Sequence, residues 1–434
     1  MLRNKQRRAI IATVTGNGLE WFDFTVYSYF SITLSKVFFP TGNDLSSLLL
    51  AVATFGVGFV MRPVGGIILG IYADKVGRKS ALTLTIAMMA VGTLLIAVTP
   101  SYESIGIAAP CIIVFARLLQ GFSAGGEMGT AGAFLTEHAP ERRRCYFASW
   151  ILSSIGVAIL LGAASGAAVT LALDATTVEL WGWRLPFLFG SLIGPVGYYL
   201  RKHLDETPVF AARSKADRSP PLFSLLSRHF KEIAAGFSLS VLWTVAVYVL
   251  LFYMPTYAAF ALHRPQSEGF VAGIVGGLAM ACAAPLAGIL ADRYGSRTVL
   301  LLSAFLILVL AWPMFKYINL VPGIASLTIF QILFGALTGA YTGPILGTFA
   351  RLFPSDVLST SVSVAYNFAV TIFGGFASFF VTWLIAQTGS NMAPALYVMA
   401  AAAISLLGVA MIRSPKGWKR GWAQDAAAAS GCCQ

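Results

Sequence analysis

Charged residues are scarce in this sequence. Lysine, arginine, aspartate and glutamate make up 11% of its 434 residues, whereas hydrophobic residues make up 57%. A soluble domain contains about 25% charged residues, because charge must cover its surface. The mean hydropathy of +0.76 leads to the same conclusion. This composition excludes a water-soluble enzyme and predicts that lipid surrounds most of the chain.

Several motifs that carry chemistry in other proteins are also missing from the sequence. The five cysteines show no C-x-x-C spacing, which gives no support for a zinc site or a disulfide framework. No G-x-x-x-x-G-K-[ST] loop is present to bind nucleotide phosphates. The four histidines fall at predicted helix ends or in loops. We therefore expect no metal and no cofactor other than a proton, and a carboxylate at any proton site within the membrane.

Long apolar runs fill the rest of the chain and indicate an all-α membrane protein. A membrane-spanning helix needs about 20 mostly apolar residues. The runs lack the short alternating segments typical of a membrane β-barrel. Charged clusters and proline or glycine residues divide them into twelve predicted spans, at residues 10–34, 47–72, 80–99, 105–136, 146–173, 184–200, 233–258, 268–291, 298–318, 323–350, 360–387 and 393–413.

The basic residues predict the orientation of these spans. The formal net charge is +12, from 30 Lys and Arg against 18 Asp and Glu. If the N-terminus lies inside, nearly all basic loop residues fall on the inner side, and only Lys36, Arg184, Arg264 and Lys316 fall outside. Cytoplasmic loops carry such an excess of Lys and Arg. We therefore expect both termini in the cytoplasm of an inner-membrane protein, and no nucleic-acid partner.

An internal repeat indicates that the chain is built from two similar halves. The segment GIYADKVGRK at 70–79 returns as GILADRYGSR at 288–297, 218 positions later. The same offset carries Gly121, Gly125 and Gly129 onto glycines 339, 343 and 347. Six spans per half make the copies parallel. We expect a six-helix half at 1–200, a proline-containing cytoplasmic linker at 201–232, a second six-helix half at 233–413 and a cytoplasmic tail at 414–434.

Specific motifs resemble those of the major facilitator superfamily. The decapeptide at 70–79 matches its pattern G-x-x-x-D-[RK]-x-G-R-[RK]. The chain is similar to the metabolite:proton symporter branch in the segments GNGLEWFDF (16–24), MRPVGG (61–66), RLLQGFSAG (117–125), GWRLPF (182–187) and LDETPVF (204–210). Within that branch, the segments at 92–97, 105–110 and 253–257 are most similar to the citrate and tricarballylate symporters.

This resemblance implies a secondary active transporter that imports a small organic acid such as citrate or tricarballylate together with protons. The expected partners are the organic anion and the lipid bilayer, and the expected state is a monomer. A symporter of a dicarboxylate, shikimate, or proline or betaine is the close alternative. An efflux antiporter is disfavoured, because Gly156, Gly162 and Gly166 occur without the Gly-Pro step that such antiporters usually carry in helix 5.

The repeated loop motif also predicts charge networks that close the cytoplasmic face. Asp74 and Asp292 occupy equivalent positions, where a carboxylate lies beside basic residues and helix ends. By resemblance, such a network holds the outward-open state. Arg351 departs from the pattern, since related second halves often carry Glu there. The predicted gate residues are Gly70, Asp74, Gly77, Arg78, Asp292, Arg293, Glu127, Glu137 and Arg142.

Three charged residues fall near the middle of the predicted membrane. Counted from the helix ends, Asp23 lies roughly 20 Å from the cytoplasmic side, and Arg62 and Arg117 roughly 22 Å and 18 Å from the outer side. A charge at this depth costs about 2.5–3.5 kcal/mol on insertion scales, so each needs a partner or a function. One acid and two arginines at one depth predict an aqueous cavity in the N-terminal half.

The spacing of these residues suggests a proton site. Glu20, Asp23 and Tyr27 share one face of the first predicted span, and Arg117, Gly121 and Gly125 share a face of the fourth. Sugar:proton symporters of the superfamily carry a carboxylate and an arginine on these helices. By that resemblance, Asp23 takes the proton, with Glu20 nearby, and Arg117 is its partner. Protonation would free Arg117 to bind a substrate carboxylate.

A purely structural role remains an alternative both for the proposed proton site and for part of the proposed binding site. Asp23 and Arg117 could instead form a permanent structural ion pair. The predicted substrate-binding residues are Arg117, Arg62, Tyr27, Tyr253 and Asn367. Tyr253 and Asn367 belong to a second half without midplane charge, and hydrogen bonds between helices would equally explain them.

Overall fold

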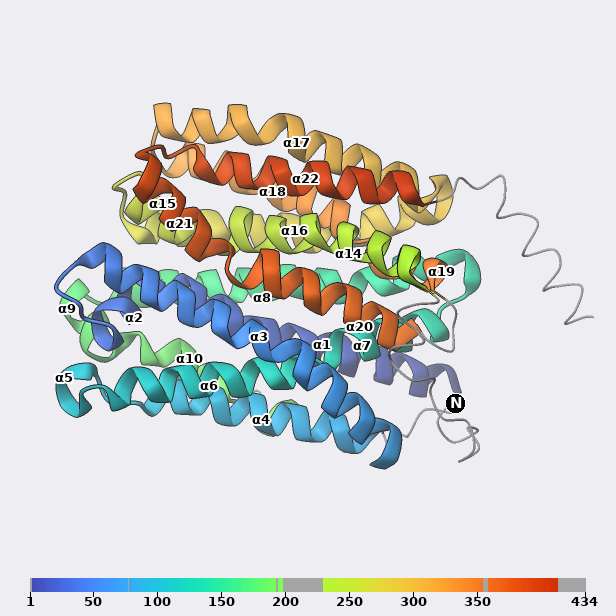
Figure 1. The fold of residues 1–434 in the computed structure, drawn as a ribbon, viewed down its shortest axis with the longest axis horizontal. Coiled ribbons are helices and arrows are strands. Elements are labelled where there is room, and N and C mark those ends of the chain that lie inside the picture. The colour runs from blue at the N-terminus through green and yellow to red at the C-terminus, as the bar shows by residue number, and fades with distance from the viewer. Residues whose placement is uncertain (1, 77, 193, 198–228, 354–357, 413–434) are drawn as a thin grey trace, which may run out of the picture.

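Helices make up almost the entire structure. A computed structural model describes residues 2–76, 78–192, 194–197, 229–353 and 358–412, and its helices run side by side along the long axis of the molecule (Figure 1). Nine helices within the described residues are long and apolar enough to cross a membrane. These observations confirm the predicted all-α membrane fold.

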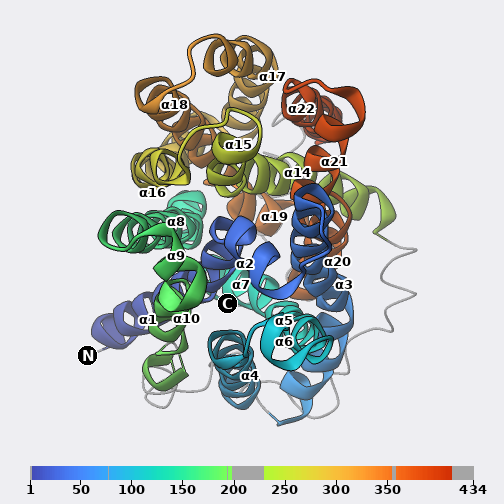
Figure 2. The ribbon, with the colours of Figure 1, turned by 90° about the vertical axis from the view of Figure 1, so that its left-hand side faces the viewer.

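The first part of the chain forms one group of helices, coloured blue to green in Figures 1 and 2. Its elements are α1 (Leu2–Tyr29), α2 (Ser31–Phe38), α3 (Asp44–Val76), α4 (Arg78–Val98), α5 (Tyr102–Ile105), α6 (Ala108–Ala124), α7 (Glu127–His138), η1 (Glu141–Arg143), α8 (Arg144–Ala172), α9 (Ala175–Thr177), η2 (Val178–Gly182) and α10 (Arg184–Ser191).

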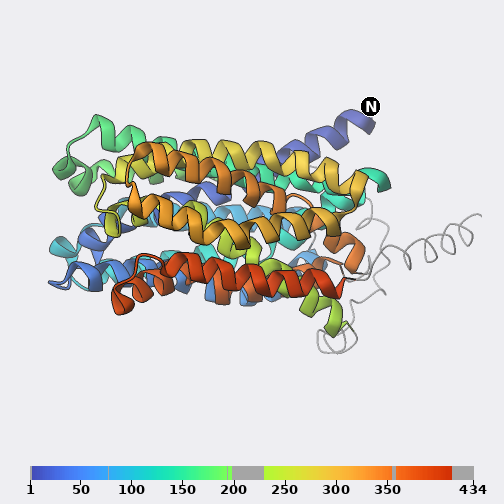
Figure 3. The same cartoon turned by 90° about the horizontal axis from the view of Figure 1, so that it is seen from above.

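The second part forms the other group, coloured yellow to red. Its elements are α14 (Phe230–Val245), η3 (Ala246–Phe252), α15 (Met254–Phe260), α16 (Gln266–Tyr294), α17 (Ser296–Leu320), α18 (Ile324–Thr342), α19 (Ile345–Leu352), α20 (Leu358–Ala369), η4 (Val370–Gly375), α21 (Ala377–Thr388) and α22 (Ala393–Met411). We call the end of the molecule that carries the N-terminus and α19 the inner end, and the opposite end the outer end (Figures 1 and 3).

Some spans are interrupted where the sequence predicts continuous helices. The span expected at 10–34 is wrong in this respect, because helix α1 ends at Tyr29 and α2 begins at Ser31 after a turn at Phe30. Helices η3 and η4 are π-helical turns within the seventh and eleventh spans. Such turns occur mostly as local bulges and often at functional sites. Both lie where the second group of helices faces the first.

The repeated glycines allow helix backbones to touch in both groups. A Cβ atom at Gly121 would lie 1.6 Å from the carbonyl oxygen of Gly58, so α6 and α3 pack backbone to backbone. The equivalent Gly339 packs in the same way, since its Cβ would lie 2.6 Å from the carbonyl oxygen of Met280 on α16. The repeated glycines therefore let the helix backbones approach closely in both groups.

Replacing Gly121 by alanine is therefore expected to prevent correct folding. The added methyl group would collide with backbone rather than with a flexible side chain, so α3 and α6 would have to separate. We expect loss of the monodisperse peak in fluorescence-detected size-exclusion chromatography. Gly323→Ala is the matched control, because nothing lies within 4 Å of a Cβ at Gly323. A monodisperse Gly121→Ala protein with the melting temperature of the parent would contradict this packing.

At the outer end, the two groups are joined by uncharged contacts. The Gln266 side chain donates a hydrogen bond to the carbonyl oxygen of Tyr29 at 2.5 Å. Ser28 Oγ donates to the carbonyl oxygen of Phe252 at 3.3 Å. The rings of Tyr29 and Phe270 pack with centroids 5.6 Å apart. These contacts connect the first helix to η3 and α16.

At the inner end, Asp292 connects the two groups. Its carboxylate accepts hydrogen bonds from the backbone N–H groups of Cys145 at 3.1 Å and Tyr146 at 2.9 Å, at the start of α8. It also forms an ion pair with Arg351 at 3.2 Å. Arg351 thus supplies the positive partner of Asp292 within its own group of helices. The two groups of helices are thus in contact at both the inner and the outer end.

The other predicted gate residues are described to different extents. Glu127 is buried at the start of α7, and Arg142 and Arg293 are exposed at the inner end. Gly70, Asp74, Arg78 and Glu137 lie in helices, but their side chains are outside the described part of the chain, as is Gly77 altogether. Most of the predicted linker (201–228) and the whole tail (414–434) also lie outside it. For these residues the sequence-based roles and the boundaries of the halves stay predictions.

Candidate functional site

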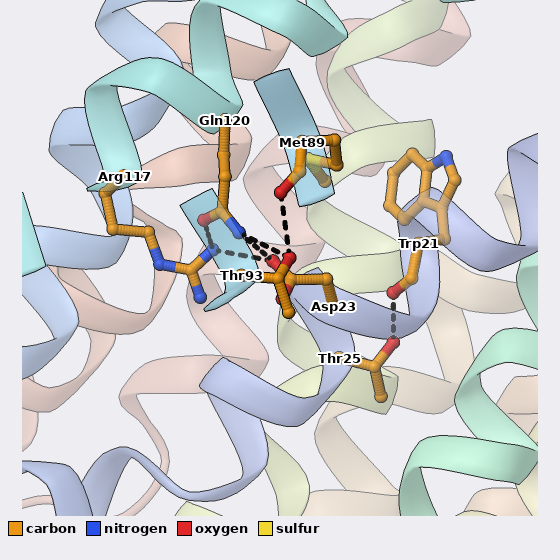
Figure 4. Close-up of polar contacts among 7 residues, drawn as sticks. All are labelled: Trp21, Asp23, Thr25, Met89, Thr93, Arg117 and Gln120. Atoms are coloured by element: carbon orange, nitrogen blue, oxygen red, sulfur yellow. Dashed lines mark hydrogen bonds and ion pairs between the residues drawn. The ribbon is translucent and has the colours of Figure 1, made fainter. Parts of the chain in front are cut away.

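Asp23 and Arg117 meet in the interior of the first group of helices. Asp23 lies on α1 and Arg117 on α6, and Arg117 Nη1 donates to Asp23 Oδ2 at 3.3 Å (Figure 4). Both side chains are 0% exposed. Taking two charges out of water costs several kcal/mol for each ion, which only close pairing and further hydrogen bonds offset. The structure thus brings these two residues together, while their roles in transport stay predictions.

Gln120 holds this ion pair from the next turn of α6. Its Nε2 donates to Asp23 Oδ2 at 2.6 Å, and its Oε1 accepts from Arg117 Nη1 at 2.7 Å. The same Nε2 lies 3.1 Å from Thr93 Oγ1, and Thr93 donates to the carbonyl oxygen of Met89 on α4 (Figure 4). The amide therefore bridges both charged groups and ties them to a third helix.

Replacing Gln120 by leucine is expected to destabilise the protein. The change removes a donor to Asp23 and an acceptor for Arg117 in a fully buried site, and each buried group left without a partner costs about 1–3 kcal/mol. Thermal unfolding in detergent should show a lowered melting temperature. Gln266→Leu is the matched control, since Gln266 also donates one hydrogen bond but lies at the outer end. Equal melting temperatures for Gln120→Leu and the parent would contradict the bridging role.

Aromatic rings surround the ion pair. The guanidinium of Arg117 lies 3.7 Å from the ring centroid of Tyr27, and the Tyr27 ring stacks on Phe55 at 5.8 Å. Such cation–π contacts stabilise a desolvated cation. The prediction of an aqueous cavity around Asp23 and Arg117 is wrong for this structure, because these rings and the neighbouring helices leave both side chains 0% exposed.

Arg62 and Arg117 both lie near the ring of Phe24. Its guanidinium is 4.4 Å from the ring centroid of Phe59 and 4.9 Å from that of Phe24, and the Arg117 guanidinium is 5.7 Å from Phe24. Within the described part of the chain, Nε and Nη2 of Arg62 have no hydrogen-bond partner, and the same two atoms of Arg117 have none. In each arginine, the guanidinium edge formed by Nε and Nη2 therefore has no hydrogen-bond partner among the described residues.

The second group of helices contributes tyrosine hydroxyls beside Arg62. Tyr248 in η3 packs on Phe59 with ring centroids 5.3 Å apart, and the Tyr248 hydroxyl has no partner among the described residues. Tyr366 on α20 likewise has a buried hydroxyl without a described partner. Arg62 and the buried Glu20 both lie within electrostatic range of these tyrosines. The site thus spans both groups of helices.

The remaining predicted binding residues serve helix contacts in this conformation. Tyr253 forms a hydrogen bond of 2.8 Å with Thr382, inside the second group. Asn367 Nδ2 donates to the carbonyl oxygen of Gly125 at 2.8 Å and so joins α20 to the first group, while its Oδ1 has no partner among the described residues. The structure thus brings Asp23, Arg117 and Tyr27 together. Tyr253 instead forms its hydrogen bond with Thr382 within the second group of helices.

Gln120, Thr93 and Tyr366 belong to this site but are missing from the sequence-based prediction. Gln120 and Thr93 support Asp23, and Tyr366 lies beside Arg62. Gln120 carries a usable signal, because it is a polar residue one turn after Arg117 in an apolar helix. No pattern in the sequence points to Thr93 or Tyr366. Among the described residues, no group of three or more His, Cys, Asp or Glu side chains is arranged to hold a metal.

A buried ion pair inside an all-helical membrane fold, with a second group of helices packed against the first, is an arrangement expected of a transporter. The family model described as Major Facilitator Superfamily matches residues 19–369. This chain belongs to the major facilitator superfamily. The match covers the Asp23 and Arg117 site and most of both halves, and the sequence-based assignment to this superfamily is confirmed.

Curated members of the superfamily resemble the chain along most of its length. A citrate-proton symporter of Klebsiella pneumoniae is 36% identical over 92% of this chain and 90% of its own. A proline/betaine transporter of Escherichia coli (strain K12) is 34% identical over 94% of this chain and 83% of its own. These relatives are transporters rather than enzymes, as the sequence predicts.

Solved structures of the superfamily share the fold. The xylose transporter from E. coli in a partially occluded inward-open conformation has a TM-score of 0.74 and 16% sequence identity, and covers 94% of this chain and 96% of its own. At this identity the likeness establishes the fold alone. It agrees with the predicted arrangement of spanning helices.

Proposed function

We propose that this superfamily member couples the inward movement of protons to the uptake of a small organic acid with at least two carboxylates, such as citrate or tricarballylate. The observation that carries the proposal is the pair of guanidinium edges, Nε and Nη2 of Arg62 and of Arg117, that have no partner among the described residues. The citrate-proton symporter relatives support the same substrate class.

These edges suit carboxylates for a geometric reason. Nε–H and Nη2–H of one guanidinium are parallel, and a carboxylate accepts both in a bidentate contact. The guanidiniums of Arg62 and Arg117 lie 4.9 Å and 5.7 Å from the same Phe24 ring centroid, so two carboxylates of one anion would each meet one guanidinium. The unpartnered hydroxyls of Tyr248 and Tyr366 would donate to further oxygens of the same anion. A buried charge without a partner is costly, so binding the anion would remove that cost.

Asp23 provides the proposed coupling to protons. Its Oδ2 accepts from Arg117 and Gln120, whereas its Oδ1 has no partner among the described residues and is the atom available to a proton. Protonation cancels the charge that holds Arg117, which then favours the substrate carboxylate. Each binding event therefore strengthens the other, as linkage requires. Glu20 lies nearby on α1 and is the second carboxylate of the proposed coupling region.

The orientation and gating follow from the same proposal. The inner end carries the basic residues, so it would face the cytoplasm, with both termini on that side of the inner membrane. Asp292 with Arg293 at the inner end, together with Gly70, Asp74, Gly77 and Arg78, would form the cytoplasmic gate. A monomer suffices, because the proposed site lies within one chain.

The direct test is uptake into proteoliposomes that contain the purified protein. We expect labelled citrate or tricarballylate to accumulate when an inward proton gradient is imposed, and accumulation to stop when a protonophore removes the gradient. Empty liposomes are the control. Uptake that does not depend on the gradient, or no uptake of any polycarboxylate, would contradict the proposal.

A zwitterion such as betaine or proline is the second candidate, and aromatic rings favour it. Trp21, Phe24 and Phe59 surround the guanidinium of Arg62. Rings of this kind also bind quaternary ammonium groups by cation–π attraction, and proline/betaine transporters are among the relatives. In this alternative Arg62 binds the single carboxylate. Competition separates the two candidates. Excess unlabelled betaine should block the uptake of labelled proline if the zwitterion is the substrate, and it should not affect the uptake of labelled citrate if the organic acid is the substrate.

A further inference from the structure

A cavity at the inner end lies between the two groups of helices, away from the proposed transport site. Its volume is about 490 Å³, and its lining residues are Arg142, Arg143, Tyr146, Ile289, Asp292 and Arg293. The first three belong to η1 and α8, and the others to the last turns of α16. A ligand in this cavity would therefore touch both halves of the transporter.

The cavity carries an excess of positive charge. Among the described residues, no carboxylate forms an ion pair with Arg142, Arg143 or Arg293. Asp292 does not neutralise them, because its two oxygens already accept from Arg351 and from two backbone N–H groups. Three exposed arginines from both halves line this one cavity, and an anion between them would offset their like charges.

The lining of the cavity continues into an apolar surface. Ile289, which lines the cavity, is 48% exposed, and Leu286, one turn earlier on α16, is 60% exposed. On α8 the ring of Tyr146 packs on Trp150 at 6.1 Å, and Trp150 is 40% exposed. Tyr and Trp are typical of the membrane interface. A basic cavity at the interface with apolar side chains beside it matches the two parts of a phospholipid.

We propose that this cavity binds the headgroup of an anionic phospholipid, whose acyl chains lie along the exposed faces of α8 and α16. Basic pockets between helices on the cytoplasmic side of membrane proteins recognise such headgroups. The bound phosphate bridges Arg142 and Arg143 on one half to Arg293 on the other. The lipid thereby stabilises the contact at the inner end. This inference is independent of the transported substrate.

Native mass spectrometry of the full-length protein in detergent tests the site without any transport assay. Phosphatidylglycerol and phosphatidylcholine with identical acyl chains are the two probes. We expect preferential retention of phosphatidylglycerol by the parent protein. Arg142→Gln with Arg143→Gln should lower this retention by about fivefold for each arginine removed. Lys316→Gln, at an exposed position near the outer end of α17, is the matched control and should retain the lipid as the parent does.

Two further arms keep the test decisive. The double variant Arg142→Lys with Arg143→Lys keeps the charge, and it should retain phosphatidylglycerol even if the glutamine variant folds poorly. Millimolar inorganic phosphate distinguishes a lipid headgroup from a soluble anion, and it should not displace phosphatidylglycerol. Equal retention of both lipids by the parent, unchanged retention by the glutamine variant, or displacement of phosphatidylglycerol by inorganic phosphate would each overturn the proposal.

Discussion

Replacing Asp23 by asparagine is expected to abolish accumulation of the substrate while leaving exchange of substrate across the membrane. Asparagine has nearly the same shape as the protonated carboxylate but cannot release or take up a proton. With one proton per substrate and no membrane potential, a gradient of one pH unit would support about tenfold accumulation. In the variant, the ratio of internal to external substrate should fall to about one. Proteoliposome uptake and counterflow measure the two activities separately.

The matched control for this prediction is Asp174→Asn. Asp174 is an exposed carboxylate that precedes α9 and accepts from Thr177 Oγ1 at 2.6 Å and from the Thr177 backbone N–H at 3.0 Å. These hydrogen bonds hold the pKa of the Asp174 carboxyl below its ordinary value, so it is ionised at neutral pH. Its replacement removes one acidic charge far from the site and should leave accumulation intact. Accumulation by Asp23→Asn against a substrate gradient would refute the proton assignment.

Replacing Arg62 by glutamine is expected to remove most of the affinity for the organic acid. The change deletes the unpartnered guanidinium edge proposed to hold a carboxylate, together with its charge. Truncating one partner of a buried, hydrogen-bonded charge pair costs about 2–5 kcal/mol, which corresponds to a roughly 30-fold to several-thousand-fold rise in Kd. Isothermal titration calorimetry with citrate or tricarballylate measures this loss directly.

Arg62→Lys separates the charge from the geometry. Lysine keeps the positive charge but presents no parallel pair of N–H groups, so a bidentate contact is lost. We expect intermediate affinity for this variant. If Arg62→Gln binds the acid as tightly as the parent does, Arg62 has no role in binding. If proline or betaine shows the large loss and polycarboxylates do not bind the parent at all, the zwitterion is the substrate.

Much of this protein's structure follows from the properties of single segments, and those properties can be read from the sequence. The length of the apolar runs predicts the spanning helices, and the cost of charge in lipid marks Asp23, Arg62 and Arg117 as special before any contact is known. The repeated glycines predict close helix contacts because only a residue without Cβ allows them, as Gly121 against Gly58 demonstrates. The motif at 70–79 is specific enough to indicate the superfamily.

The contacts across long separations could be seen only in the tertiary structure. Asp23 and Arg117 are 94 positions apart, and their meeting depends on how α1 and α6 rotate and pack. The same packing brings Gln120 onto both charges, and it surrounds Arg62 with aromatic rings in place of water. Hydrophobic periodicity determines which face of a helix is buried, but not the neighbour that it meets. Side-chain interlocking between helices decides that neighbour, and with it the geometry of the site.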